Sequence, residues 1–217
     1  MFRNFIFDWS GTLVDDLGPV IEATNAVFRK YNLPPYDREG FRRHFRLPYR
    51  DFYADVLPDI PLEELEAHFR PAFDEAITPV TILPHAREKL EWCAAHGIRT
   101  FVLTSMDTAA FEKQMDQFGL RGLFEATYSS VLDKREVIHR ILETHALAPE
   151  ETAFVGDMTH DVETARHGGV SSIAVLTGYN HPEILAAVRP DITVPDLGVL
   201  RSLLERRKRV VRPVATV

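Results

Sequence analysis

Four short, almost continuously apolar runs constrain the fold of this chain most. They are residues 4–7 (NFIF), 99–104 (RTFVLT), 152–156 (TAFVG) and 171–177 (SSIAVLT). Strands with one face in water alternate apolar and polar residues, whereas strands covered on both faces are apolar nearly throughout. The runs therefore predict the buried strands of a parallel sheet.

Helical patterns lie between these runs. Segment 84–97 has a proline at its start and a glycine at its end, which is the usual punctuation of a helix. Segment 133–147 repeats apolar residues at helical spacing, and segment 160–169 ends in a glycine pair. Strands that alternate with helices predict an α/β, Rossmann-like, doubly wound sheet, which binds ligands at the carboxyl ends of its strands.

Residues 17–80 break this alternation. They read as four helical stretches, at 18–33, 37–46, 49–57 and 62–77, with no convincing strand. We predict that 17–80 form a small α-helical cap domain inserted after the first strand. The core domain would then consist of 1–16 and 81–217.

Composition narrows the functional classes. The net charge of −7 argues against a nucleic-acid partner, and no run of about 18 apolar residues predicts a membrane span. The N-terminus does not resemble a secretory signal, and the only cysteine, Cys93, is expected in a helix core. We therefore expect a cytoplasmic monomer or homodimer, with the basic segment 206–217 as a solvated tail.

Polar residues follow the predicted strands directly. Asp8 ends the first run, Thr104 ends the second, and Asp157 and Asp161 follow the third, while Lys134 opens a helix. Carboxylates gathered in one crevice raise one another's pKa, and a divalent cation removes that cost. Hard oxygen ligands suit Mg²⁺ together with a phosphate. Lys134 and the Thr104 hydroxyl could then hold phosphoryl oxygens, which leaves Asp8 as a candidate nucleophile.

Four segments, in order, resemble the motifs of the haloacid dehalogenase-like hydrolase superfamily. They are DWSGT at 8–12, VLTS at 102–105, Lys134, and GDMTHD at 156–161. The helical insertion resembles the cap of phosphoglycolate phosphatase-like members.

The resemblance implies a role for each motif residue. Asp8 would be the nucleophile, and Mg²⁺ would be held by Asp8, the Ser10 carbonyl, Asp157 and Asp161. The phosphoryl group would be bound by Gly11, Thr12, Thr104, Ser105 and Lys134. We expect a small phosphorylated metabolite as the substrate.

Ser10 departs from the family pattern. Phosphatases of this family carry an acid there, which protonates the leaving alkoxide and later activates water. Loss of a positioned general acid–base typically costs about 10²–10⁴ in rate. Three explanations remain open: a leaving group that needs no proton, a proton from another residue such as His160, or slow turnover. A surface-loop position is the simpler expectation for His160.

The cap stretch 41–53 is rich in arginine and includes Arg46, Tyr49 and Arg50 as candidate substrate contacts. We expect Pro48 to interrupt the helix there. A basic loop that faces the site would suit a second anionic group on the substrate, although a solvated charged face is the alternative. The stretch has no lysine for the Schiff base of phosphonoacetaldehyde hydrolases, which the segment FDWSGT also resembles.

These features predict a Mg²⁺-dependent phosphohydrolase that acts on a small anionic phosphomonoester through an aspartyl phosphate, like phosphoglycolate phosphatase. Three alternatives stay open. The protein could be a catalytically impaired protein that binds phosphate or a phosphometabolite, a phosphonatase-like enzyme, or an acyl-phosphate hydrolase.

Overall fold

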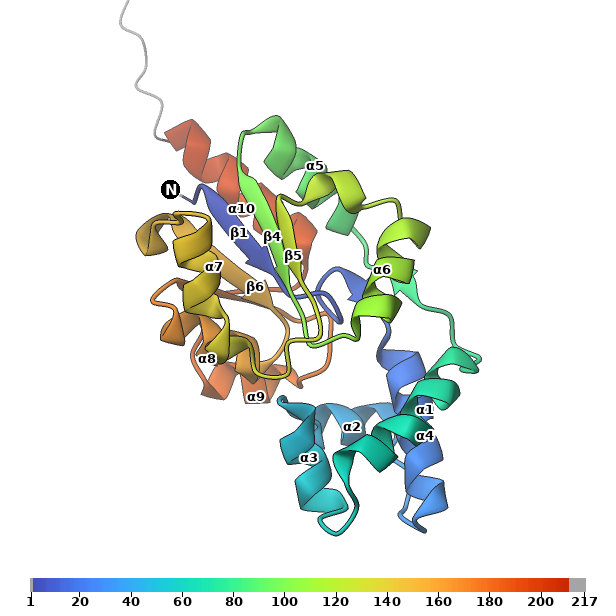
Figure 1. Ribbon diagram of the computed structural model, residues 1–217. Helices are drawn as coiled ribbons and strands as arrows, with labels where there is room; N and C mark the ends of the chain where they lie inside the picture. The colour runs from blue at the N-terminus through green and yellow to red at the C-terminus, as the bar shows by residue number, and fades with distance from the viewer. Residues whose placement is uncertain (1, 211–217) are drawn as a thin grey trace, which may run out of the picture.

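The computed structural model describes residues 2–210, with side chains through 206 (Figure 1). Its centre is a six-stranded parallel sheet in the order β5-β4-β1-β6-β7-β8. The four predicted strands are confirmed as β1 (Asn4–Phe7), β4 (Arg99–Leu103), β6 (Thr152–Gly156) and β7 (Ser171–Val175). Apart from one partly exposed residue at the start of β4 and of β7, their residues are buried.

Two edge strands, β5 (Ala126–Tyr128) and β8 (Ile192–Val194), were not predicted. Each has three residues, and most of these are only partly buried. A short strand at an edge needs no continuous apolar run, so the pattern that identifies the central strands does not identify these two.

Helices cover both faces of the sheet, which confirms the doubly wound architecture (Figure 1). One core cluster packs α5 (Ala86–Ala95), α6 (Thr108–Gln117) and α10 (Leu197–Val210) against the strands. A second packs α7 (Ile138–Thr144) and α8 (Thr159–His167) on the opposite face. A shorter helix, α9 (Pro182–Ala187), follows β7. Cys93 is fully buried in α5, as expected.

The insertion consists of α1 (Leu17–Lys30), α2 (Arg38–His44), α3 (Tyr49–Val56) and α4 (Leu62–Asp74). Helices α1, α3 and α4 share an apolar cluster that is separate from the sheet, whereas Phe41 of α2 packs in another cluster with Met158 and Tyr179 of the core. The short strands β2 (Val14–Asp15) and β3 (Thr81–Ile82) pair antiparallel and join the two ends of the insertion. Pro48 stands directly before α3, as predicted. Domain boundaries at 16/17 and 80/81 stay a prediction.

Two further sequence predictions concern membrane-spanning helices and the basic C-terminal segment. Within residues 2–210, none of the helices has the length and apolar character needed to traverse a bilayer. Of the basic tail at 206–217, residues 206–210 continue α10, and the rest lie outside the described residues.

Candidate active site

The order of the strands brings the motif residues to one edge of the sheet. β1 lies between β4 and β6, so that Phe7 pairs with Val102 on one side and Val155 on the other. Asp8 directly follows β1, and its N–H donates to the Val155 carbonyl at 2.8 Å. Asp157 directly follows β6. These positions place the two carboxylates at neighbouring strand ends.

Three buried carboxylates meet at this edge. Oxygen atoms of Asp8, Asp157 and Asp161 lie within 4.8 Å of one another. Asp161 Oδ2 accepts the N–H groups of Asp157 and Met158 at 3.1 and 3.0 Å, which fixes the first turn of α8. Asp157 accepts the Thr12 hydroxyl at 2.9 Å. The cluster is therefore held rigidly from several segments.

The electrostatics of this cluster favour a cation. Burial raises the pKa of Asp8 to about 7, and the charge of Asp161 adds to this, while Lys134 opposes it. Burial also raises the pKa of Asp157 well above its ordinary value, and the charges of Asp8 and Asp161 reinforce the shift. A divalent cation would relieve both effects, and an all-carboxylate oxygen set is the donor chemistry that Mg²⁺ prefers. The residues present therefore fit the metal.

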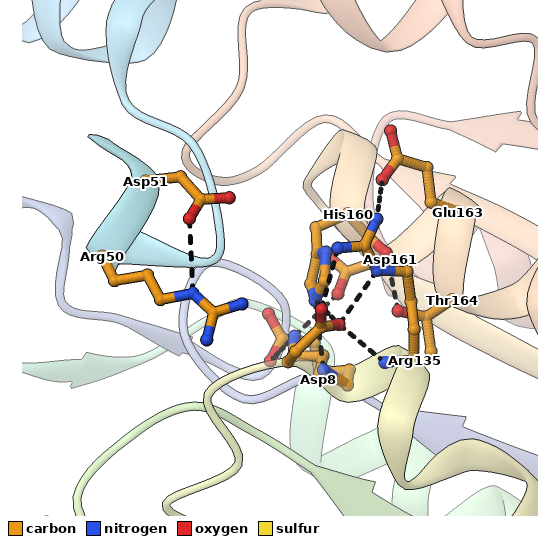
Figure 2. A network of polar contacts seen from close by, with 10 residues as sticks. Asp8, Arg50, Asp51, Arg135, His160, Asp161, Glu163 and Thr164 are labelled. Atoms are coloured by element: carbon orange, nitrogen blue, oxygen red, sulfur yellow. Dashed lines mark hydrogen bonds and ion pairs between the residues drawn. The ribbon is translucent and has the colours of Figure 1, made fainter. Parts of the chain in front are cut away.

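Lys134 is fully buried against two of these acids. Its Nζ lies 2.7 Å from Asp8 Oδ1 and 2.7 Å from Asp161 Oδ1. Burial alone lowers the pKa of this ammonium group, but the carboxylates of Asp161 and Asp8 outweigh burial and raise the pKa above its ordinary value. The lysine is thus cationic beside the candidate nucleophile. Figure 2 shows Asp8 and Asp161 within this network of polar contacts.

Close backbone approach at the cluster requires glycine. Gly11 has φ +76°, and a Cβ there would collide with the Asp157 carboxylate. Gly178 is equally close to the same carboxylate, and the N–H of Tyr179 donates to Asp157 Oδ2 at 2.6 Å. The loop after β7 therefore completes the cradle around Asp157, a contribution that the sequence motifs did not reveal.

Ser10 takes part in a buried hydrogen-bonded group. Its hydroxyl donates to Asp16 Oδ2 at 2.6 Å, and the Tyr179 hydroxyl donates to Asp16 Oδ1 at 2.7 Å. Asp16 has no exposed surface, and burial raises its pKa to about 6. An acid directly before a helix would ordinarily be taken for an N-cap, but the Asp16 side chain caps nothing in α1. Its burial and its hydrogen bonds to Ser10 and Tyr179 distinguish it from Asp15, which is partly exposed.

Thr104 and Ser105 occupy the strand end beside Asp8. Thr104 is buried, and its hydroxyl accepts the N–H of Met106 at 3.2 Å. Ser105 lines the pocket described below. Their roles in phosphate binding stay predictions.

The candidate cap contacts separate into two kinds. Tyr49 lines the pocket and donates to Glu66 at 2.6 Å. Arg46 is paired with Asp55 at 2.6 Å and does not line it. Arg50 also lies outside the lining and has an exposed ion pair with its sequence neighbour (Figure 2).

His160 was expected on a surface loop, and this expectation is wrong. The residue is 1% exposed and belongs to α8. Its Nε2 accepts the N–H of Lys134 at 3.2 Å, and burial lowers its pKa to about 4. A neutral imidazole that supports the Lys134 backbone, and does not line the pocket, is poorly placed to replace a catalytic acid.

A cavity of about 480 Å³ lies between cap and core. Asp8, Ser10 and Asp16 line it, together with residues of α1, α4 and α6. Its volume is in the usual range for small-molecule sites. A ligand in the cavity would therefore contact both the candidate nucleophile and the cap.

Comparison with known proteins agrees with this geometry. The model of a family described as haloacid dehalogenase-like hydrolase matches residues 5–175. A phosphoglycolate phosphatase of Synechococcus elongatus is 26% identical over 192 residues, which are 87% of this chain and 91% of the relative. A 5'-nucleotidase of Pseudomonas aeruginosa is 26% identical over 94% of this chain and 96% of its own length.

Solved structures show the same fold. A haloacid dehalogenase-like hydrolase from Streptococcus pneumoniae superposes with a TM-score of 0.75 at 21% identity, over 94% of this chain and 98% of the other. A hydrolase from Pseudomonas syringae gives a TM-score of 0.79 at 18% identity, with the same coverage of both chains.

Proposed function

The chain belongs to the haloacid dehalogenase-like hydrolases, and from this premise we propose that it is a Mg²⁺-dependent phosphohydrolase that works through an aspartyl phosphate on Asp8. One observation carries the proposal: three buried carboxylates and a buried lysine converge beside a cavity that only one of those carboxylates lines, namely Asp8. Of the three clustered acids, Asp8 is thus the one that a substrate in the cavity can reach.

Mg²⁺ would be held by Asp8, the main-chain carbonyl of Ser10, Asp157 and Asp161. When bound, it would neutralise these acids and withdraw charge from the phosphoryl group. Lys134 keeps the free carboxylate oxygen of Asp8 oriented and supplies a fixed positive charge near the phosphoryl oxygens. Gly11, Thr12, Thr104 and Ser105 would supply the remaining phosphate contacts.

In the first step, a carboxylate oxygen of Asp8 forms a bond to phosphorus while the ester P–O bond breaks. The leaving group departs with the electron pair of that bond. In the second step, water attacks the phosphorus of the acyl phosphate, which releases inorganic phosphate and restores Asp8.

The substrate class has support of unequal strength. The relatives named phosphoglycolate phosphatase and 5'-nucleotidase support a small phosphomonoester. The expected role of the cap arginines has less support, because Arg46 and Arg50 are paired with aspartates of the cap and lie outside the cavity lining. A phosphoglycolate-like anion therefore rests on the relatives alone.

Steady-state release of phosphate from acetyl phosphate, measured with Mg²⁺ or with EDTA, tests the proposal. Acetyl phosphate is small and its leaving group needs no protonation. We expect metal-dependent turnover in the wild type and background rates for Asp8→Asn. Turnover that survives Asp8→Asn would refute the covalent mechanism.

A second candidate function is a phosphate- or phosphometabolite-binding protein with vestigial turnover. The observation that favours it is Ser10, which cannot act as the missing acid. Absence of turnover on acetyl phosphate, combined with Mg²⁺-dependent binding of inorganic phosphate by calorimetry, would support this candidate over the enzyme.

A further inference from the structure

We infer that the substrates of this site are phosphomonoesters of a bulky aromatic hydroxyl group, that is, aryl phosphates, in preference to esters of small anionic alcohols. The inference rests on the proposed function and adds the chemistry of the leaving group. Two independent observations support it: the lining of the cavity and the residue at position 10.

Aromatic side chains form a large part of the cavity wall beyond Asp8. Six lining residues are aromatic, and they come from the cap and from the loop after β7: Phe45, Tyr49, Tyr53, Phe69, Phe73 and Tyr179. Phe69 and Phe73 stack with their ring centroids 6.0 Å apart, and Phe45 packs 5.6 Å from Tyr179. A two-carbon leaving group would leave most of this 480 Å³ space unfilled, whereas a fused aromatic ring would contact these side chains.

The charges of the lining disfavour a second anionic group on the substrate. Five carboxylic acids line the cavity, at Asp8, Asp16, Glu66, Asp74 and Asp107, against two cations. One cation, Arg70, is paired with Glu66 at 3.4 Å and with Asp107 at 3.3 Å. The other, Lys113, is exposed to solvent. A carboxylate on the leaving group would therefore face more acids than bases.

The absence of an acid at position 10 independently favours substrates whose leaving group can depart without being protonated. An alkoxide is a base about as strong as hydroxide, whose conjugate acid has a pKa of about 15.7, so it departs with difficulty unless an acid protonates it. A phenol ionises near pKa ~10, as tyrosine does, so its oxide can leave unprotonated. Ser10 directs its proton to Asp16 and is not a strong acid. Asp16 also lines the cavity, but its two oxygens accept hydrogen bonds from Ser10 and from Tyr179, so it is held as an acceptor. The site is thus equipped for an ester whose P–O bond breaks without proton donation.

The proposed step balances without another reagent. The Asp8 carboxylate forms the new O–P bond, and the aryl oxide leaves with the electron pair of the broken P–O bond. The oxide then takes its proton from solvent as it departs. Water supplies the oxygen of the inorganic phosphate released in the second step.

The test compares phosphate release from acetyl phosphate, phenyl phosphate, 2-naphthyl phosphate, phosphoglycolate and a nucleoside 5'-monophosphate, with the full chain and Mg²⁺. We expect kcat/KM to rise about tenfold or more from phenyl to 2-naphthyl phosphate, mainly through a lower KM, since apolar pockets reward added apolar bulk. We expect both aryl esters to exceed phosphoglycolate and the nucleotide, which have alkoxide leaving groups.

Phe73→Ala tests the cavity wall directly, because Phe73 is only half-buried and lies outside the apolar clusters of cap and core. We expect it to lower kcat/KM for 2-naphthyl phosphate about tenfold more than it lowers kcat/KM for acetyl phosphate. Ile77→Ala is the matched control, because Ile77 follows the same helix, is 93% exposed and does not line the cavity. A thermal melt of each variant verifies folding, and Phe73→Leu serves if the alanine variant fails to fold.

The outcomes separate the two proposals. No turnover of acetyl phosphate would refute the proposed function itself. Turnover of acetyl phosphate with a preference for phosphoglycolate or the nucleotide would overturn only the aryl inference. Equal rates for phenyl and 2-naphthyl phosphate, unaffected by Phe73→Ala, would overturn it as well.

Discussion

Replacement of Asp16 by asparagine should change how the stability of the protein depends on pH. Asp16 is a fully buried carboxyl whose pKa burial raises from 3.8 to about 6, even though Ser10 and Tyr179 donate to it. The unfolded chain ionises this group at lower pH than the folded chain does. Its contribution to stability is therefore complete below pH 3.8 and is lost as the pH rises through about 6.

The magnitude follows from the shift. About two pKa units at ~1.36 kcal/mol each amount to a loss of roughly 3 kcal/mol once both states are ionised, and about half of this falls between pH 5 and pH 8. Asparagine has nearly the same shape and stays neutral. From pH 5 to pH 8, the free energy of unfolding of the wild type should therefore fall by about 1.5 kcal/mol more than that of Asp16→Asn.

Urea unfolding at the two pH values measures this difference, with EDTA present so that metal binding does not contribute. Tryptophan fluorescence is a suitable signal, because Trp9 is fully buried next to Ser10. Asp15→Asn is the matched control for loss of a neighbouring negative charge. Parallel pH dependence of the wild type and Asp16→Asn would refute the reasoning, because it would mean that Asp16 ionises alike in both states.

Three further results are expected. The double variant Ser10→Asp, Asp16→Ser should raise kcat/KM for alkyl phosphomonoesters by about 10² or more and kcat/KM for aryl esters only little, so both substrate types are measured. Asp16 is replaced as well because Ser10→Asp alone would place two carboxylates in contact. Lys134→Met should lower the free energy of unfolding, measured with urea in the absence of metal, by about 3–5 kcal/mol, because it leaves two buried acids unpaired. Added Mg²⁺ should recover part of this loss, and no recovery would argue against a metal there. Gly11→Ala should abolish Mg²⁺-dependent turnover and lower the melting temperature, because the alanine Cβ would collide with the Asp157 carboxylate and the backbone has a positive φ there. Near-normal kinetics of this variant would contradict the close approach of Gly11 to Asp157.

Sequence by itself determined the central architecture and the identity of the candidate catalytic motifs. Strands covered on both faces are apolar throughout, so β1, β4, β6 and β7 were recognisable without any coordinates. Asp8 and Asp157 directly follow two of those strands, and parallel neighbours end at one edge of a sheet. Local pattern and chain order were therefore enough to predict that these two side chains would meet.

Tertiary structure alone decided how the site is lined. Gly178 and Tyr179 reach the Asp157 carboxylate, and Asp16 reaches Ser10, from positions outside the motifs. The aromatic wall of the cavity comes from the cap and from the loop after β7, which only the fold brings together. His160 looked like a loop residue until α8 buried it. Sequence spacing fixes neighbours along a strand or a helix, but burial and charge pairing depend on segments far apart in the chain. The sequence therefore revealed that Ser10 departs from the family pattern. Its acid partner, Asp16, and the apolar space beside it became visible only in the fold.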